Sequence, residues 1–362
     1  MVLFRCVAAL AGEAITVAKP AEVLDSPPRE ELIDEMSQRD LQEAFRYLRS
    51  RYIKRESLSD LELNRAALSG LLDRLDFGAY LLTRESEAKV QNGYAFKHDT
   101  VGERIVYLRP AELDEAELAE IDTVLRELES RPDARLILDL RVPGSSIGYR
   151  QALQFLDRFC PAGKLLFKIT RPGRDRAEVF ASSRVPLWHG RPLILLIDLD
   201  TPGPLETVCA ILRQTHPCTV IGEASAGRTV DYENVTLSEG KILRYAVAEV
   251  VLADGASLFR KGIEPDLSAR TPPMDKRLIL KASESRPITD FILDRARPRM
   301  NEAALVDGSN PELPYLIAKS ARRKTEFDEV PRQDPVIRMA VDFLTAEEFM
   351  KESAWFKGKH ED

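Results

Sequence analysis

Apolar residues follow two different rhythms along this 362-residue chain, and the change of rhythm divides it. Between positions 28 and 80 they recur at spacings of three to five, which is the pattern of helices that bury one face. This stretch and the short polar segment after it predict a helical N-terminal unit at residues 28–95. The two apolar stripes are Leu32, Met36, Leu41, Phe45 and Leu48, then Leu61, Ala66, Leu68, Leu71, Leu72 and Leu75.

From about residue 100, short apolar runs alternate with longer amphipathic segments. Strands that alternate with helices in this way are typical of βαβ units and of a mostly parallel sheet. The sequence therefore predicts an α/β core at residues 100–270, in which residues 232–252 add two or three antiparallel strands. Strands are expected at 104–108, 135–139, 164–170, 192–197 and 218–221, and helices at 115–128, 149–159 and 205–214.

The two ends of the chain lie outside this alternation. Helix signals return after the core, so we expect a C-terminal helical extension at residues 271–362, with one helix at 334–344. At the other end, Arg5 precedes a short apolar run at residues 6–11. This arrangement is similar to a truncated secretory signal, and residues 1–27 are interpreted as a signal stub or leader.

Composition and charge narrow the classes of function. With 52 Lys and Arg against 59 Asp and Glu, the formal net charge is −7, whereas nucleic-acid binding rests on clustered basic residues. No segment approaches the ~18 consecutive apolar residues of a membrane span. The four histidines and four cysteines show none of the spacings of a metal site, so we expect neither a metal nor another cofactor.

Three predicted strands end in turns that are rich in Gly, Pro and polar residues. They are residues 139–145, residues 198–206 and residues 222–228. Because the carboxyl ends of parallel strands meet at one edge of a sheet, these turns are expected to lie together and to form the functional site.

The order of these motifs resembles that of the C-terminal processing peptidases, also called tail-specific serine proteases. That family carries Asp-Leu-Arg-x-Asn-Pro-Gly-Gly, Thr-Ala-Ser-Ala-Ser-Glu and Gly-Glu-x-Thr-x-Gly-Lys-Gly at the positions of the three turns. Its closing Gly-Ile-x-Pro-Asp is present as residues 262–266, and its N-terminal helices are similar to residues 52–72 and 75–81. The resemblance covers residues 41–266, and residues 334–344 are similar to the family's closing helix. It implies a peptidase core of the ClpP/crotonase-like fold, flanked by helical segments.

The family works with a serine nucleophile, a lysine base and a nearby glutamine. Its mechanism requires a neutral lysine within hydrogen-bond reach of the hydroxyl. Placed on this sequence without a gap, the nucleophile position falls on Gly203, the base on Arg228 and the glutamine on Tyr232. Glycine has no side chain that could attack, and arginine keeps its proton near neutral pH. The resemblance therefore implies a peptidase that lacks all three catalytic identities.

Neighbouring positions also differ from the family. The turn that helps to form the family's oxyanion hole is shortened here and contains Gly144 and Ser145, and Pro204 removes one N–H from the start of the next helix. The permanent charge of Arg228 would be buried or half-buried and would need a carboxylate partner. We expect a structural ion pair between Arg228 and one of three candidates, which are Glu206, Asp231 and Glu223.

The PDZ domain that typical members insert before the core has no room in this chain. Only residues 88–102 are available for it, far fewer than the ~50 residues of an independent domain. We therefore expect no PDZ domain. Together with the N-terminal stub, the resemblance favours export to a periplasmic or extracytoplasmic compartment, with the cytoplasm as the alternative.

Other polar side chains near the three turns offer a rearranged site. A displaced Ser-Lys pair would use a serine from Ser145, Ser146 and Ser225 and a lysine from Lys261 and Lys241. We favour the interpretation that these serines form turns and caps. Tyr149 and Tyr232 are expected to fill the family groove rather than to line it. Among the histidines, His189 is expected in a loop, and His98, His216 and His360 at the surface.

Three functions remain open from the sequence. The favoured one is an inactive peptidase homologue that binds peptides or partner proteins in the family groove. The others are an active serine-type endopeptidase with a rearranged nucleophile and a non-peptidase enzyme on the crotonase-like fold, although no acyl-CoA signature is visible. A homo-oligomer is also open, because the family's helical ends often mediate dimers or rings.

Overall fold

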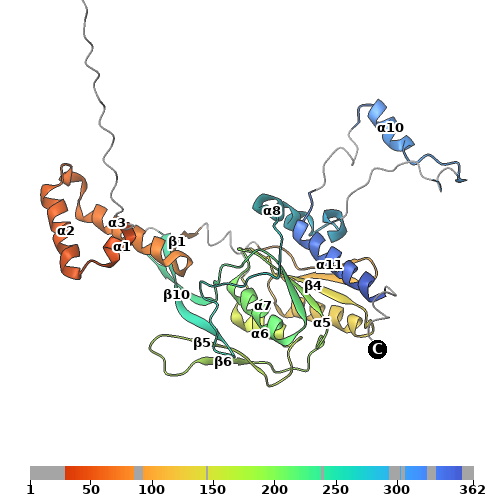
Figure 1. Cartoon of the computed structure of the whole chain (residues 1–362), viewed down its shortest axis with the longest axis horizontal. Helices are drawn as coiled ribbons and strands as arrows, with labels where there is room; N and C mark the ends of the chain where they lie inside the picture. The colour runs from red at the N-terminus through yellow and green to blue at the C-terminus, as the bar shows by residue number, and fades with distance from the viewer. Residues whose placement is uncertain are drawn as a thin grey trace, which may run out of the picture. The chain divides into compact units, whose positions relative to one another are not determined.

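A computed structural model of the chain describes residues 29–84, 93–143, 146–237, 240–292, 302, 306–323 and 332–352 (Figure 1). The chain divides into two compact units, residues 1–74 and residues 75–362. The boundary therefore lies earlier than the end of the helical unit expected at residues 28–95. The predicted leader at residues 1–27 lies outside the described residues.

The first unit is helical. It contains α1 (Arg29–Asp34), α2 (Gln38–Arg51), the 3-10 turn η1 (Arg55–Ser57) and α3 (Asp60–Leu75), which ends at the unit boundary. α2 begins with a capping box, because the Ser37 hydroxyl accepts the N–H of Asp40 and the Asp40 carboxylate accepts the N–H of Ser37, both at 3.2 Å. Among the described residues of α2 and α3, no side chain is buried.

The second unit is built on a six-stranded, mostly parallel sheet. Its strands run in the order β11 (Leu267–Ser268), β8 (Cys218–Gly222), β7 (Leu193–Ile197), β4 (Arg135–Asp139), β3 (Ile105–Arg109) and β2 (Lys97–Val101). Only the pair of β2 with β3 is antiparallel. The α/β fold predicted from the sequence is confirmed.

A second, antiparallel sheet belongs to the same unit. Its main path runs β1 (Ala79–Thr83), β10 (Lys241–Leu252), β5 (Leu165–Thr170) and β6 (Glu178–Ala181), and β9 (Val230–Thr236) also pairs with β10. β10 is the centre of this sheet, because it pairs with β1, β5 and β9. β9 follows the last of the three turns, and its pairing with β10 joins that turn to the rest of this sheet.

The parallel sheet is apolar on both faces, as expected for strands covered on two sides. One face packs against α5 (Glu115–Glu129), α6 (Tyr149–Leu156), α7 (Gly203–Thr215) and residues of the antiparallel sheet. The other face packs against α8 (Pro273–Ala282), η4 (Ile288–Phe291) and α11 (Pro335–Glu352); Figure 1 shows α8 in teal and α11 in blue. α10 (Leu313–Ser320) has no buried side chain. The core is thus layered, and α8, η4 and α11 from the C-terminal extension form its outer layer.

Two strands occupy sequence that was expected to be helical or polar. β1 pairs with residues 241–245 of β10, and β2 pairs with β3. Both strands are five residues long, and β1 finds its partner far away in the sequence. Local apolar spacing does not show such long-range pairing, which is why the sequence assigned this stretch to the helical unit.

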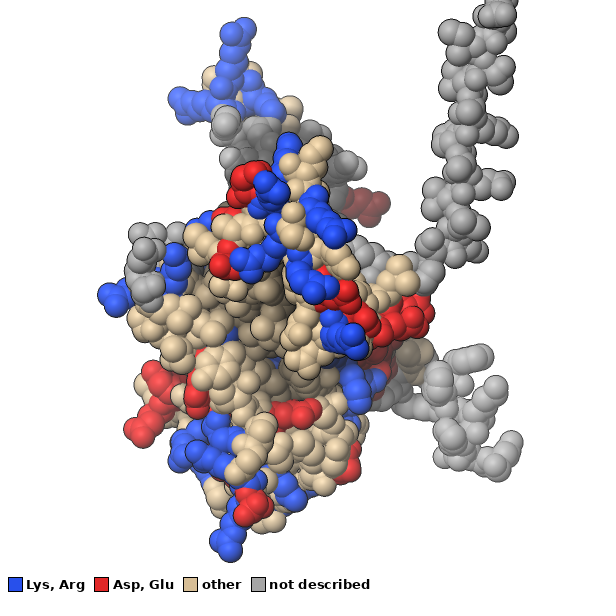
Figure 2. All heavy atoms as spheres, turned by 90° about the vertical axis from the view of Figure 1, so that its left-hand side faces the viewer, with Lys and Arg blue, Asp and Glu red and all other residues tan. Residues whose placement is uncertain are grey.

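The surface carries both signs of charge. In Figure 2, basic and acidic side chains are interspersed across the face that is shown. Among the described helices, none combines the length and the apolar character needed to cross a membrane.

A buried ionic network attaches α11 to the parallel sheet. The Arg141 guanidinium lies between Asp139 at 2.8 Å and Asp334 at 3.0 Å, and all three side chains are at most 1% exposed. Asp334 also accepts the Thr271 hydroxyl at 2.7 Å and the N–H of Val336 at 3.0 Å, so it caps α11. Burial would raise the pKa of Asp139, but Arg141 and the Tyr107 hydroxyl outweigh burial and hold it below its ordinary value.

We predict that Asp334→Ala lowers the free energy of unfolding by about 3–5 kcal/mol, because it leaves the buried Arg141 charge with one carboxylate and removes the cap of α11. Chemical denaturation followed by circular dichroism measures the change. Asp342→Ala is the matched control, since Asp342 is 73% exposed on the same helix, and it should change stability by less than about 0.5 kcal/mol. Equal effects of the two substitutions would contradict this role for the network.

Candidate functional site

The three turns singled out by the sequence follow β4, β7 and β8, which are neighbours in the parallel sheet. Two main-chain hydrogen bonds connect the starts of the turns: Leu140 N–H to the Leu196 carbonyl at 2.9 Å, and Glu223 N–H to the Ile197 carbonyl at 3.1 Å. The shared edge expected for these turns is therefore present. Gly144 and Ser145 of the first turn lie outside the described residues.

The turn after β7 is shaped by its own polar side chains. The Thr201 hydroxyl accepts the Asp198 N–H at 2.9 Å, and the Asp198 carboxylate accepts the Asp200 N–H at 2.9 Å. Lys276 of α8 binds both carboxylates, Asp198 at 2.5 Å and Asp200 at 2.6 Å, and its side chain is only 3% exposed. The turn that leads into α7 is thereby fixed from the C-terminal extension.

Gly203 is the first residue of α7 and lies against main chain from the third turn. An added Cβ at this position would be 1.9 Å from the Arg228 carbonyl oxygen and 2.6 Å from the Arg228 carbonyl carbon. It would also be 3.2 Å from the Cα of Thr229. A side chain at position 203, including that of a serine, therefore cannot be accommodated unless the backbone of the third turn shifts.

The third turn is held in this place by Glu206, one turn further along α7. One carboxylate oxygen accepts the N–H of Gly227 and the other the N–H of Arg228, both at 2.6 Å. Burial raises the pKa of Glu206, and hydrogen bonds from Ser225 and from these two amides oppose that rise. The carboxylate thus occupies these two main-chain donors, which are not available to bind another anion.

The ion pair expected for Arg228 is not found among the described residues, and the expectation that its charge is buried needs correction. The Arg228 side chain is exposed, because its N–H faces Glu206 and its carbonyl faces Gly203. The other two candidates bind different arginines: Asp231 binds Arg171 at 2.5 Å, and Glu223 binds Arg270 at 3.3 Å. The main chain of residue 228, rather than its side chain, makes the contacts at the site.

Two tyrosines fill space beside the turns. The Tyr149 hydroxyl donates to the Val230 carbonyl at 3.1 Å, and Tyr149 is 8% exposed. The Tyr232 hydroxyl donates to the Phe77 carbonyl at 2.9 Å. Burial raises the pKa of both phenols. Each hydroxyl therefore serves as a structural donor to a carbonyl.

The described hydroxyls near the turns have structural partners, with one exception. The Ser225 hydroxyl accepts the Ile263 N–H at 2.9 Å and is bound to Glu206, and the Ser146 hydroxyl binds the Glu112 carboxylate. Lys261 and Lys241 are both exposed. The exception is Thr229, whose buried hydroxyl has no hydrogen-bond partner in the described part of the chain.

Residues 262–266 pack against the third turn and hold it by hydrogen bonds. Ser225 N–H donates to the Ile263 carbonyl at 3.1 Å, and Gly262 has a φ of +66°, which favours glycine. A Cβ at Gly262 would be 2.0 Å from the Ser225 carbonyl oxygen. Asp266 closes the motif, since its N–H donates to the Val220 carbonyl at 2.7 Å and its carboxylate accepts the Val220 N–H at 2.8 Å. The motif therefore has a structural role, which is to fix the third turn and the strand before it.

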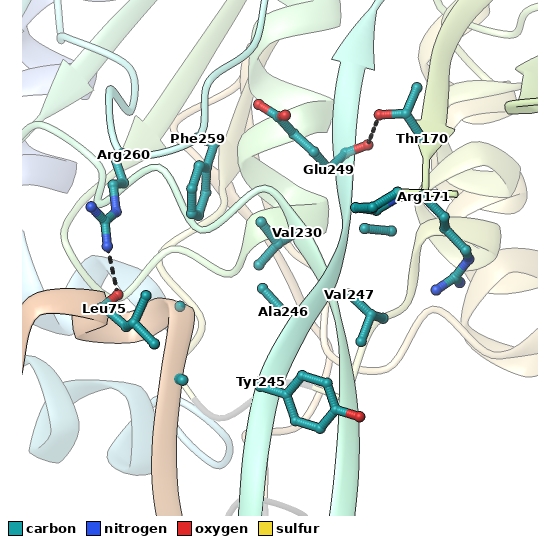
Figure 3. Close-up of a pocket in the computed structure, with 14 residues that line it drawn as sticks. Leu75, Thr170, Arg171, Val230, Tyr245, Ala246, Val247, Glu249, Phe259 and Arg260 are labelled. Atoms are coloured by element: carbon teal, nitrogen blue, oxygen red, sulfur yellow. Dashed lines mark hydrogen bonds between the residues drawn. The ribbon is translucent and has the colours of Figure 1, made fainter. Parts of the chain in front are cut away.

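A groove beside Val230, shown in Figure 3, was not expected from the sequence. Its volume is about 770 Å³, and its lining is mostly apolar. The floor is the β10 run from Tyr245 to Glu249, and the walls include Leu75 and Phe259. Two small residues in this run, Ala246 and Ala248, are the only signal of a hollow that the sequence offers.

We predict that Gly203→Ala lowers the free energy of unfolding by about 1–3 kcal/mol, because the new methyl group overlaps the Arg228 carbonyl. Urea denaturation measures the change. The matched control is Gly148→Ala at the start of the neighbouring α6, where the added Cβ meets only the flexible end of Gln151. The control should stay within about 1 kcal/mol of the wild type. A neutral Gly203→Ala would show that the site has room for a side chain.

We predict that Glu206→Gln destabilises the fold by about 1–3 kcal/mol under acidic conditions, because the amide NH2 group cannot accept the second N–H, whereas both oxygens of a carboxyl group can accept even when it is protonated. Burial raises the Glu206 pKa, so the stability contributed by this group is present below its ordinary pKa and is lost as pH rises through the folded value. The margin of the wild type over the variant should therefore shrink as the pH rises above the ordinary glutamate pKa of about 4.3. A difference in the free energy of unfolding that grows with pH would contradict this role of Glu206. Glu223→Gln is the control, because the Glu223 side chain is 31% exposed.

The core of this chain is similar in sequence to known peptidases. The family model described as Peptidase family S41 matches residues 104–269. Carboxy-terminal processing proteases CtpA and CtpB of Bacillus subtilis (strain 168) are 24% and 22% identical to this chain and cover 76% and 70% of it. The chain spans 57% of CtpA and 51% of CtpB, about half the length of these relatives.

Two solved peptidase structures are also similar to part of this chain. A putative peptidase from Parabacteroides merdae ATCC 43184 has a TM-score of 0.47 at 14% identity, and the match covers 67% of this chain and 85% of that one. The photosystem II D1 C-terminal processing protease has a TM-score of 0.41 at 18% identity, with coverage of 49% and 48%. The family match over residues 104–269 and the curated relatives agree with the resemblance read from the sequence: the core of this chain is similar to that of the C-terminal processing peptidases.

Proposed function

We propose that this chain is a catalytically inactive member of its family that binds peptides or partner proteins. The observation that carries the proposal is the contact between Gly203 and the Arg228 carbonyl, where an added Cβ would be at 1.9 Å. The resemblance of the motifs places the family's nucleophile and base at these two positions. Here one has no side chain, and the main chain of the other fills the space next to it.

The remaining groups at the site support the same conclusion. Arg228 is exposed and keeps its proton near neutral pH, so it supplies no base. Ser225 is bound to Glu206 and to the Ile263 amide, and Glu206 accepts the amides of Gly227 and Arg228. A hydrolytic site needs a free nucleophile, a base and free donors for the oxyanion, and these residues are committed to structure.

A binding role is the part of the family function that this architecture can retain. The groove beside Val230 offers a mostly apolar cavity of about 770 Å³, within the size range of ligand sites in proteins. The stretch between β1 and β2 is too short for an inserted PDZ domain, so in our proposal the core itself captures the ligand. The proposal extends to export and to assembly with further copies, as the family resemblance suggests.

The proposal predicts that the purified chain does not cleave an unfolded protein such as reduced casein, or peptides with apolar C-termini, in a time-course followed by mass spectrometry. Cleavage that is lost in one hydroxyl variant and kept in the others would instead show a rearranged nucleophile. The variants are Ser146→Ala, Ser225→Ala and Thr229→Val, of which Thr229 carries the unpartnered hydroxyl among the described residues.

A further inference from the structure

We infer that the groove beside Val230 binds a short, extended peptide segment, which pairs with the free side of β10 at Ala246–Ala248. The inference rests on the proposed binding function and specifies its ligand: a segment of about three residues with apolar side chains and an acidic flank. It follows from the pairing of the antiparallel sheet, from the lining of the groove and from the charges at its rim.

On one edge of β10, a short segment between its two partner strands is not paired with a described strand. β1 pairs with β10 from Lys241 to Tyr245, and β5 pairs with it from Glu249 to Leu252. On the opposite side, β9 pairs with β10 continuously from Ile242 to Glu249 apart from a bulge at Ala246/Ala248. Between β1 and β5, the three residues Ala246–Ala248 therefore have no strand partner among the described strands.

The groove lies at this interval. Its lining includes Ala79 and Thr170, the last paired residues of β1 and β5, together with the whole β10 run between their partners. Three residues of extended chain span about 10 Å, so a short peptide segment matches the interval. Exposed main-chain groups of a strand are the usual template for adding an extended peptide, and bulges are frequent beside such sites.

Apolar side chains surround the open edge. Leu75 and Phe259 form one wall, and Val230, Ala246 and Val247 lie between that wall and the β5 end of the groove in Figure 3. These side chains would contact the apolar side chains of the bound segment. A purely polar ligand would bury these apolar side chains against polar groups, which is unfavourable.

Charges at the rim favour an acidic flank. Two guanidiniums, those of Arg171 and Arg260, and a single carboxylate, that of Glu249, line the groove. The Glu249 carboxylate already accepts the Ser257 hydroxyl. The Arg171 charge is shared with Asp231 at 2.5 Å, which makes the preference for an acidic ligand moderate rather than absolute.

Contacts among its own residues hold the groove in shape without a ligand. Arg260 donates to the Leu75 carbonyl at 2.7 Å, and the rings of Phe77 and Phe259 meet edge to face at 5.6 Å. The Tyr232 hydroxyl binds the Phe77 carbonyl at 2.9 Å, so β9 is joined to the same wall. A preformed site loses less conformational freedom on binding, which favours a short ligand.

The test uses fluorescein-labelled, C-terminally amidated peptides of the sequence Asp-Val-Ala-Val-Ala and the full chain, with binding followed by fluorescence anisotropy. A second peptide carries N-methyl groups on the two central amides, and a third begins with Lys. We expect N-methylation to weaken binding about tenfold, because it removes main-chain donors, and the Lys peptide to bind about threefold more weakly.

Two valine variants locate the site on the protein. Val247→Trp fills the groove and should weaken the Asp peptide at least tenfold. Val179→Trp places the same side chain on β6 of the same sheet, where Val179 is 59% exposed, and should leave binding unchanged. Circular dichroism of both variants establishes that the fold is kept.

Equal binding of the N-methylated peptide would overturn pairing with β10, and equal binding by Val247→Trp would overturn the groove as the site. Stronger competition by laurate than by unlabelled peptide would show that the groove takes a lipid chain instead. Lack of binding by every peptide at millimolar concentration would also refute the inference. Mass spectrometry of the same mixtures separates the two claims, since peptide cleavage contradicts catalytic inactivity while leaving the groove intact.

Discussion

The arrangement of the candidate site depends on one close approach, that of the Arg228 carbonyl to the Cα of Gly203. Only a residue without a Cβ allows it, because any side chain there would meet the carbonyl oxygen at 1.9 Å. Once the third turn lies against α7, its two amides reach the Glu206 carboxylate, and its Arg228 side chain is directed to solvent. The geometry of the turn, of the acidic side chain and of the exposed arginine thus has a single origin.

Polar residues at the ends of parallel strands commonly serve ligands, but here they mainly hold the C-terminal extension. Arg141 binds both Asp139 and Asp334, which lies at the start of α11, and Asp198 binds Lys276 of α8. These buried pairs fix how α8 and α11 cover one face of the sheet. The polar side chains at this edge therefore attach helices to the sheet, whereas the mostly apolar groove lies beside β10.

The sequence predicts the regular part of this fold well and the site less completely. The core strands and helices appear close to their predicted bounds, because each has a strong local pattern of apolar residues, as in β4 and α5. β1 and β2 were not predicted, since they are short and β1 depends on distant β10. Residue types at Gly203 and Arg228 were sufficient to question catalysis. They could not show that the backbone of Arg228 would face the helix, because that follows from a contact between residues that are distant in sequence.

The most direct measurement is a pair of crystal structures, of the wild-type chain and of its Gly203→Ser variant. Our account predicts that the wild-type Arg228 carbonyl lies against Gly203, and that the introduced serine displaces the turn from Gly227 to Thr229 and breaks its hydrogen bonds to Glu206. A serine side chain seated at the start of α7 with this turn unmoved would contradict the account.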